Sequence, residues 1–234
     1  MSITTTATAP ASSIRPPLRP LVEAKGVTMR FGGVTAVNAV DFVLGEVELR
    51  CLIGPNGAGK STFFKMLTGQ LTPSEGSIRF RDTDITGAEP HRIARLGVGI
   101  KTQVPNVFNG LSVRENVFVA AGRRKSIART RSIVDETLTR LQLTAIAERN
   151  VGQLAHGQRQ WVEIATVLAQ EPELILLDEP TEGIQPSIVS AIETVIEELK
   201  GRITVLLVEQ YLEFAVRLAD SFVVLSRGNV VERG

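Results

Sequence analysis

Sulfur-containing and aromatic residues are scarce in this chain. Its 234 residues include one Cys, one Trp and one Tyr, and aromatic residues make up only 5% of the composition. The lone Cys51 cannot form an internal disulfide, which excludes the disulfide-stapled scaffolds of small secreted proteins and suits the reducing cytosol. Cys51 lies in an apolar run, so we expect it to be a small buried apolar residue.

Long apolar runs and a dominant charge are also missing. No uninterrupted stretch of about 18 apolar residues occurs, so the sequence predicts no membrane span of its own. The formal net charge is +1, which gives no reason to expect a nucleic-acid partner or an anionic membrane surface. If the protein works at a membrane, another chain must supply the passage.

The first 20 residues differ in composition from the rest. They hold four of the eleven prolines, with many Ser, Thr and Ala, and they lack the apolar stretch of a signal peptide. We therefore expect residues 1–20 to form a disordered tail. Residues 21–234 are enough for a single α/β domain that carries an inserted subdomain.

A glycine-rich segment at 54–61 carries the strongest functional signal. Its sequence, Gly-Pro-Asn-Gly-Ala-Gly-Lys-Ser, fills every position of the pattern G-x-x-x-x-G-K-[ST]. A strand-like run at 48–53 precedes it and a helix-like run at 61–67 follows, which is the context that this motif requires. Loop amides and the N-terminus of the following helix bind phosphate oxygens. A glycine-rich loop can be purely structural, but the complete motif favours binding of a nucleoside triphosphate.

The side chains of this segment have distinct expected roles. Lys60 reaches the β- and γ-phosphates, and the Ser61 hydroxyl coordinates Mg²⁺. The expected nucleotide-binding residues are Gly54, Pro55, Asn56, Gly57, Ala58, Gly59, Lys60, Ser61 and Thr62.

An acidic pair follows the apolar run at 174–177. Asp178 and Glu179 stand at the end of an expected buried strand, where a carboxylate is costly unless it meets a cation or hydrogen-bond donors. Asp178 is placed to support Mg²⁺, partly through water, while Glu179 can accept a proton from the attacking water. The alternative is a strand that ends in two solvated acids.

Apolar runs alternate with helical stretches along the chain. The continuous runs at 174–178 and 203–208 are typical of parallel strands covered on both faces, and the helical spacing at 187–200 makes them a βαβ unit. Residues 76–81 and 222–231 are expected to be antiparallel, the second turning at 227–229. Residues from about 104 to 160 carry helical patterns and predict an inserted helical subdomain.

One further segment makes the family resemblance specific. Residues 154–158, Leu-Ala-His-Gly-Gln, open a helix with an apolar stripe that includes Trp161. The phosphate loop, Gln103, residues 154–158 and the acidic strand end occur in the order and spacing of the nucleotide-binding subunits of ABC (ATP-binding cassette) transporters. Over residues 21–234 the chain resembles this family, and within it the ATPases of bacterial branched-chain amino acid, amide and urea uptake systems.

These uptake systems contain two types of ATPase, and the chain has features of both. The segments at 30–33, 90–97 and 154–158 resemble one type. The segments at 181–187 and 207–211 are more similar to the partner type, particularly that of urea systems. This mixed character leaves the transported solute open.

The resemblance implies a fold, a reaction and a set of partners. The fold is an α/β P-loop NTPase core with a mainly parallel sheet, an antiparallel β subdomain and the helical insertion. The reaction is hydrolysis of ATP with Mg²⁺, coupled to solute import. Two ATPase subunits, identical or paralogous, would dock on two membrane permease subunits at the cytoplasmic face of the bacterial inner membrane. A periplasmic binding protein would act indirectly, and no nucleic acid takes part.

The resemblance also assigns residues to the site. Each ATP would lie between one subunit's phosphate loop and the other subunit's residues 154–158. Phe31 matches the aromatic residue that stacks on adenine, with a buried core Phe as the alternative. Gln103 would sense Mg²⁺ and the γ-phosphate, and Gln210 would occupy the switch position after the last core strand. The residues acting in trans are Leu154, Ala155, His156, Gly157 and Gln158.

Several positions depart from the family pattern. Ala155 replaces a serine and thereby removes one γ-phosphate hydrogen bond, a loss on the order of 1–2 kcal/mol. His156 replaces a glycine, Gln185 stands where aspartate is usual, and Gln210 replaces a histidine, so it cannot become cationic. We interpret these changes as variation within the subfamily, with an open effect on the hydrolysis rate. A metal or acid–base site at His156 is the alternative, but the only other histidine, His91, is not at ligand spacing.

Two other functions compete with the role of transporter ATPase. A soluble ABC protein acting on ribosomes or DNA would carry two cassettes or long coiled coils, which this chain lacks. A regulatory nucleotide binder that hydrolyses ATP weakly is the other rival.

The basic cluster of Arg123, Arg124, Lys125, Arg129 and Arg131 is either a solvated helix face or a partner-binding feature. Residues 104–150 are expected to dock a short permease helix.

Overall fold

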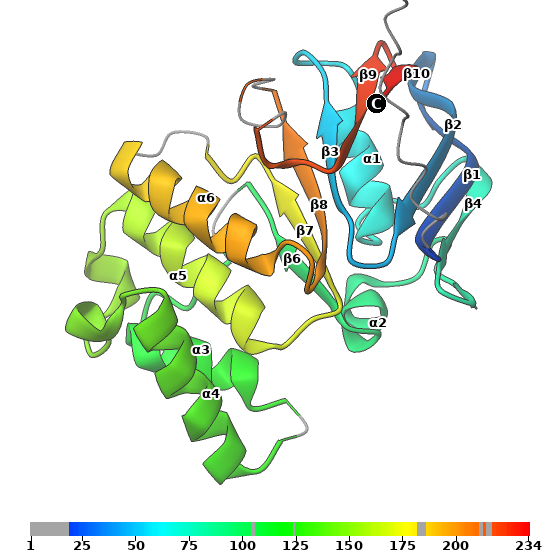
Figure 1. Cartoon of the computed structure of the whole chain (residues 1–234). Coiled ribbons are helices and arrows are strands. Elements are labelled where there is room, and N and C mark those ends of the chain that lie inside the picture. The colour runs from blue at the N-terminus through cyan, green and yellow to red at the C-terminus, as the bar shows by residue number, and fades with distance from the viewer. Residues whose placement is uncertain (1–18, 104–105, 124, 182–185, 211–212, 214–216) are drawn as a thin grey trace, which may run out of the picture.

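The computed structural model describes residues 19–103, 106–123, 125–181, 186–210, 213 and 217–234. Most of the expected disordered tail therefore lies outside the described residues, as do Val104, Arg124 and Gln185. The first strand already begins at Pro20, one residue before the expected start of the folded domain. Two β-sheets and a group of helices make up the described chain (Figure 1).

An antiparallel sheet contains the N-terminal strands in the order β2-β1-β4-β5. Its strands are β1 (Pro20–Phe31), β2 (Val34–Gly45), β4 (Glu75–Phe80) and β5 (Thr83–Asp84). The antiparallel strand expected near residues 76–81 is confirmed, whereas the sequence pattern did not single out β1 and β2. Alternating burial along β2, with Val37, Val40, Phe42 and Leu44 inside, shows that one face of this sheet packs on the core.

A second sheet has six strands in the order β10-β9-β3-β8-β7-β6. Its strands are β3 (Leu49–Ile53), β6 (Val98–Lys101), β7 (Leu174–Asp178), β8 (Thr204–Glu209), β9 (Ser221–Ser226) and β10 (Asn229–Arg233). All pairs are parallel except β9–β10. The hairpin expected at 222–231 is confirmed, but β9 also pairs in parallel with β3, because it completes the central sheet.

The helices surround this six-stranded sheet. They are α1 (Lys60–Leu67), α2 (Pro90–Arg95), α3 (Val113–Ala121), α4 (Ile127–Arg140), α5 (His156–Ala169) and α6 (Pro186–Leu199). The described residues between 106 and 155 form α3, α4 and two short 3₁₀ turns, Thr144–Ile146 and Val151–Gln153. The expected helical region is present, but α5 continues past the predicted limit at 160, because its apolar stripe continues to Ala169.

Each face of the six-stranded sheet has its own apolar core. Cys51, Ile175 and Leu207 point to the side covered by α3 to α6, while Leu52, Leu176 and Leu206 point to the side of α1 and the antiparallel sheet. Successive strand residues point to opposite faces, so both faces of the sheet are buried, as the continuous apolar runs predicted. Cys51 is fully buried, and burial raises the pKa of its thiol to about 12.

Candidate active site

The loop between β3 and α1 has a shape that requires glycine at two positions. Gly59 precedes α1 with a φ of 103°, and a Cβ there would lie 2.5 Å from the carbonyl oxygen of Ala36. A Cβ on Gly54 would clash with the carbonyl oxygen of Leu225. Within the described chain, the first turn of α1 has no side-chain cap and no acidic residue, so its amides face the loop unblocked. Such a loop is a cradle for phosphate.

Lys60 is the first residue of α1, and its ammonium group points back into this loop. The residue is 4% exposed, and Nζ donates to the carbonyl oxygens of Gly54 at 2.7 Å and Pro55 at 3.4 Å. The same Nζ lies 3.6 Å from Oε1 of Glu179. An ammonium group has three donors, so it can exchange a carbonyl partner for a phosphate oxygen.

The acidic pair at the end of β7 is buried. Asp178 is 6% and Glu179 is 8% exposed, so the alternative of two solvated acids is wrong. Burial, and then the charge of Glu179, raises the pKa of Asp178 to about 6. Within the described chain, Oδ1 of Asp178 has no hydrogen-bond partner. A buried carboxylate oxygen of this kind suits a hard cation such as Mg²⁺, which prefers oxygen ligands.

The backbone of Glu179 is strained. Its φ is +44°, a left-handed conformation that costs a non-glycine residue on the order of 1–3 kcal/mol. The amide of Glu179 donates to the carbonyl oxygen of Val208 at 3.0 Å, which fixes the turn against β8. This turn places the carboxylate beside Lys60 rather than in line with the strand.

The ends of four parallel strands bring the separate motifs to one edge of the sheet. In the strand register, Lys101 pairs with Leu177, Asp178 with Val208, and Ile53 with Glu209. Gln103 follows β6 and Gln210 follows β8, the strands on either side of β7, and the phosphate loop follows β3, the next strand after β8; Figure 1 shows the order of these strands. The structure thus brings the phosphate loop, Gln103, the acidic pair and Gln210 to the same edge of the sheet.

Residues 154–158 do not join this group within one chain. They lead into α5, which packs on the opposite face of the six-stranded sheet from α1 (Figure 1). Ala155 and His156 are exposed. The backbone amide of Ala155 donates to Oε1 of Gln158 at 3.1 Å, whereas the alanine side chain has no atom that could complete the cap. Leu154 is buried in the core, so the outward-facing part of this segment is Ala155 and His156.

His156 shows no sign of a metal site. Its Nε2 lies 2.9 Å from the side-chain amide of Gln160. Among the described residues, no group of three His, Cys, Asp or Glu side chains is arranged to hold a metal ion. The structure gives the metal hypothesis no support.

Phe31 is on the surface. It is the last residue of β1 and is 48% exposed, so the buried-core alternative is wrong. Its strand partner Val34 is 67% exposed. An exposed ring beside an exposed aliphatic side chain offers an apolar surface on which a base can stack.

Sequence reasoning missed a third acid at this edge of the sheet. Glu209 is the last residue of β8, is 1% exposed, and accepts a hydrogen bond from the Thr181 hydroxyl at 2.8 Å. Burial is the main cause that raises the pKa of its carboxyl to about 7; the hydrogen bond from Thr181 opposes this rise and the nearby charge of Glu179 adds to it. The signal was available, because Glu209 ends an apolar run in the same way as Asp178 does.

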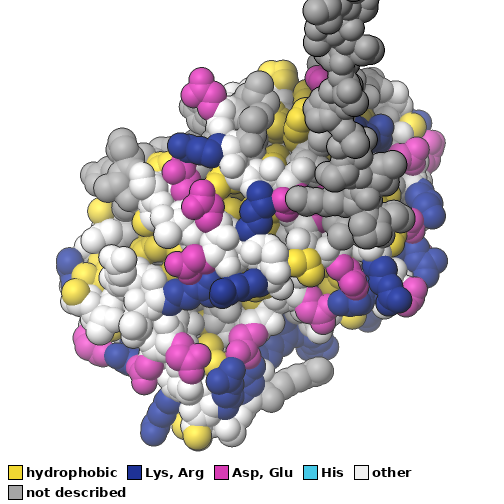
Figure 2. All heavy atoms as spheres, viewed as in Figure 1, with side chains coloured by type: hydrophobic (Ala, Val, Ile, Leu, Met, Phe, Trp, Pro, Cys, Tyr) yellow, Lys and Arg dark blue, Asp and Glu magenta, His cyan; other side chains and the backbone are white. Residues whose placement is uncertain are grey.

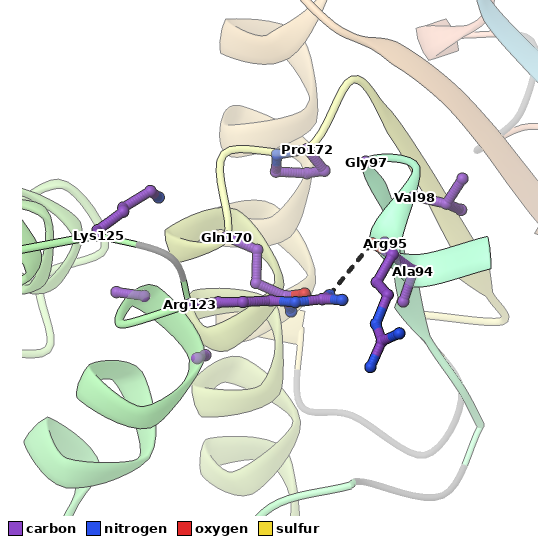
Figure 3. Close-up of a pocket in the computed structure, with 10 residues that line it drawn as sticks. Ala94, Arg95, Gly97, Val98, Arg123, Lys125, Gln170 and Pro172 are labelled. Atoms are coloured by element: carbon purple, nitrogen blue, oxygen red, sulfur yellow. Dashed lines mark hydrogen bonds between the residues drawn. The ribbon is translucent and has the colours of Figure 1, made fainter. Parts of the chain in front are cut away.

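The basic cluster joins several parts of the structure and is not one solvated helix face. Lys125 and Arg129 contact the carboxylate of Glu171 at 2.8 and 2.6 Å, and Arg123 donates to the carbonyl oxygen of Ala94 at 3.3 Å. Arg123 extends along Gln170 in a pocket of about 140 Å³ between α2, α3 and the end of α5 (Figure 3). On the face shown in Figure 2, basic and acidic side chains are interspersed.

The described helices include none with the length and apolar character needed to cross a membrane.

The sequence as a whole is similar to known transporter subunits. A family profile described as "ABC transporter" matches residues 37–182. The chain is 35% identical to the high-affinity branched-chain amino acid transport ATP-binding protein BraF of Pseudomonas aeruginosa, over 90% of this chain and 89% of BraF. It is also 35% identical to the corresponding protein LivG of Salmonella typhimurium, over 92% of each chain.

Solved structures agree with this similarity. A nucleotide-free ATP-binding cassette from an ABC transporter superposes with a TM-score of 0.80 at 27% identity, covering 92% of this chain and 91% of the other. A dimeric, post-hydrolysis ATP-binding cassette bound to ADP and Pi superposes with a TM-score of 0.80 at 27% identity, covering 91% of this chain and 97% of the other. The P-loop fold with its helical region is therefore confirmed.

Proposed function

The chain belongs to the family of ABC transporter ATP-binding subunits, and from this premise we propose that it hydrolyses ATP to power a bacterial importer of branched-chain amino acids. The observation that carries the proposal is the meeting of a glycine cradle, a buried Lys60 and two buried carboxylates at one edge of the sheet. The similarity to BraF and LivG supports the choice of solute class.

We propose that ATP is held by residues 54–62 and by Phe31. The loop amides and the positive end of α1 bind the β- and γ-phosphates. Lys60 exchanges the carbonyl oxygens of Gly54 and Pro55 for phosphate oxygens. The exposed Phe31 ring stacks on the base, an interaction worth roughly 1–3 kcal/mol.

Asp178, Ser61 and Gln103 would hold Mg²⁺. Asp178 supplies a buried oxygen without a hydrogen-bond partner among the described residues, and the exposed Ser61 hydroxyl lies on the first turn of α1. When bound, Mg²⁺ neutralises charge on the transferred phosphoryl group. Asp178 acts partly through water, as the resemblance implies.

Glu179 accepts the proton of the attacking water. Its carboxylate is buried and lies 3.6 Å from the Lys60 ammonium, a position between the phosphate cradle and the acidic strand end. Gln210 follows the adjacent strand and can donate a hydrogen bond, but it carries no titratable proton. More of the orientation of the water therefore rests on Glu179.

A second subunit completes the site. Ala155 and His156 are exposed at the start of α5, which packs on the opposite face of the sheet from α1. A related cassette is dimeric with ADP and Pi bound. In our proposal the start of α5 from one subunit approaches the phosphates held by the other, head to tail. Gly157 permits close approach of the backbone, and the positive end of α5 faces the anion.

The helical region would contact the permease. Phe108, which precedes α3, is 61% exposed, and Val119, in the last turn of α3, is 55% exposed. Exposed apolar side chains of this kind can contact a short amphipathic helix. We therefore place the subunit at the cytoplasmic face of the inner membrane, attached to two permease subunits that receive solute from a periplasmic binding protein.

Turnover measured with and without the permease tests the proposal. The purified chain should hydrolyse MgATP, and reconstitution with its two permease subunits should raise turnover when the binding protein and a branched-chain amino acid are present. Hydrolysis that never responds to permease would contradict the transport role. Binding without hydrolysis would indicate a regulatory nucleotide binder instead.

A further inference from the structure

A buried acid on α5 has no place in the site described so far. Glu163 lies about two turns after the start of α5 and is 2% exposed. Burial raises the pKa of its carboxyl to about 7. Its neighbours in sequence, Val162 and Ile164, belong to the apolar core, so a charge here is costly unless specific contacts justify it.

Those contacts are to the chain on both sides of Gln103. Oε1 of Glu163 accepts a hydrogen bond from the backbone amide of Asn106 at 2.9 Å, and the backbone of Thr102 lies near the carboxyl group and opposes the rise of its pKa. The fully buried Lys101 adds an attractive charge to Glu163 and donates from Nζ to the carbonyl oxygen of Thr102 at 3.0 Å. One side chain thus ties two backbone positions that flank Gln103 to α5.

The same helix begins at the segment offered to the second subunit. Residues 156–163 span about 10 Å along the axis of an α-helix, which transmits a displacement as a stiff element. Within the described chain, Oε2 of Glu163 has no hydrogen-bond partner. A carboxylate kept for stability alone is a poor choice at such a position, because an apolar side chain of similar volume often packs as well or better.

We propose that Glu163 is a positioning residue that couples Gln103, at one ATP, to residues 154–158, which meet the other ATP. A shift of Gln103 on nucleotide binding moves the two amides, Glu163 follows them, and α5 carries the movement to its own N-terminus. This role rests on the proposed function, because it requires two subunits that share their ATP sites.

A double-mutant cycle between Glu163 and Gln103 tests the coupling. Glu163→Met keeps the side-chain volume but removes both acceptor oxygens, and in the full-length chain it should lower kcat for MgATP about tenfold while the KM for ATP stays within about twofold. In a Gln103→Ala background the same substitution should change kcat by less than about twofold, since the residue through which it acts is gone. Glu163→Gln keeps one acceptor oxygen and should restore most of the turnover.

Ile164→Val is the matched control. It shortens the adjacent side chain, which packs toward α6, and should leave kcat unchanged in both backgrounds. Equal fold-losses from Glu163→Met with and without Gln103 would overturn the coupling while leaving the ATPase assignment intact. Wild-type protein that fails to hydrolyse MgATP would overturn the proposed function and this role together.

Discussion

The two halves of the proposed ATP site are built in opposite ways. The half in the core is preassembled, since Lys60, Asp178 and Glu179 are each less than a tenth exposed and lie together at one edge of the six-stranded sheet. The half on the helical region is open, since Ala155 and His156 are exposed and face no phosphate in their own chain. In the proposed site, the groups that would do chemistry are already desolvated, whereas residues 154–158 would act only when a second subunit binds.

This difference suggests where each kind of control resides. Buried charges in the core hold one another in place, so removing one of them should change chemistry or affinity strongly. In the proposed dimer, the exposed start of α5 would gain its partner only on closure, so changes there should be smaller and should depend on subunit association.

Glu179→Gln should give the largest effect. The amide keeps the shape but cannot accept the proton, and general-base catalysis is worth roughly 10²–10⁴-fold, so turnover should fall at least about a hundredfold. MgATP affinity should stay near wild type, and a closed, ATP-loaded dimer should accumulate in size-exclusion chromatography. The exposed Glu232→Gln on β10 is the matched control. Near-normal turnover of Glu179→Gln would show that the core half does not supply the base.

The pH dependence of stability should reflect one buried acid from each half. Burial raises the pKa of both Glu209 and Glu163 to about 7 from an ordinary value of 4.5. The native state therefore holds more protons than the unfolded state between these values, so the free energy of unfolding falls as pH rises through the window. Each of the two groups should change it by on the order of 3 kcal/mol between about pH 4.5 and 7.5.

Urea unfolding of the nucleotide-free chain at a series of pH values would measure this change. In Glu163→Gln, the contribution of one group disappears, and the pH dependence should become shallower. A free energy of unfolding that rises over this window would contradict the assignment of these acids as protonated by burial.

Lys60→Ala should weaken nucleotide binding. It removes the ammonium that faces the phosphates, and a hydrogen bond to a charged group is worth about 1.5–3 kcal/mol, so MgATP affinity should fall about ten- to a hundredfold. Isothermal titration calorimetry with the exposed Lys65→Ala on the same helix as control would measure it. Wild-type affinity in Lys60→Ala would remove the phosphate-cradle assignment altogether.

Ala155→Ser should give the smallest effect, and it acts on the open half. The N-cap of α5 now has one hydrogen bond, from the backbone amide of Ala155 to Oε1 of Gln158. A serine hydroxyl at this position can accept a second hydrogen bond, from the backbone amide of Gln158, which should stabilise the chain by about 0.5–1 kcal/mol. The same hydroxyl should strengthen ATP-dependent dimerisation by restoring a γ-phosphate contact. Ala128→Ser, exposed in α4, is the control for thermal unfolding. Unchanged dimerisation would indicate that residues 154–158 do not meet nucleotide.

The half of the site in the core was the part that the sequence predicted best. The phosphate loop, the buried strands and the acidic pair are contiguous motifs whose chemistry depends on local spacing, so their positions were correct to within a residue or two. β1 and β2 were not found individually, because their alternation is interrupted by register shifts and by glycines near the turn. The sequence also left undecided whether Phe31 is exposed or buried, since an aromatic residue at a strand end can point toward the core or toward solvent.

The amino-acid sequence by itself determined that this chain binds a nucleoside triphosphate, because a complete phosphate loop encodes its own backbone shape and charge. Tertiary structure alone decided which other groups meet that loop. The register of four parallel strands places Gln103, Asp178, Glu209 and Gln210 at one edge, and the packing of α5 brings Glu163 to the amides beside Gln103. These contacts join residues about 50 to 150 positions apart, and no local pattern specifies them because they form only when both faces of the sheet are covered.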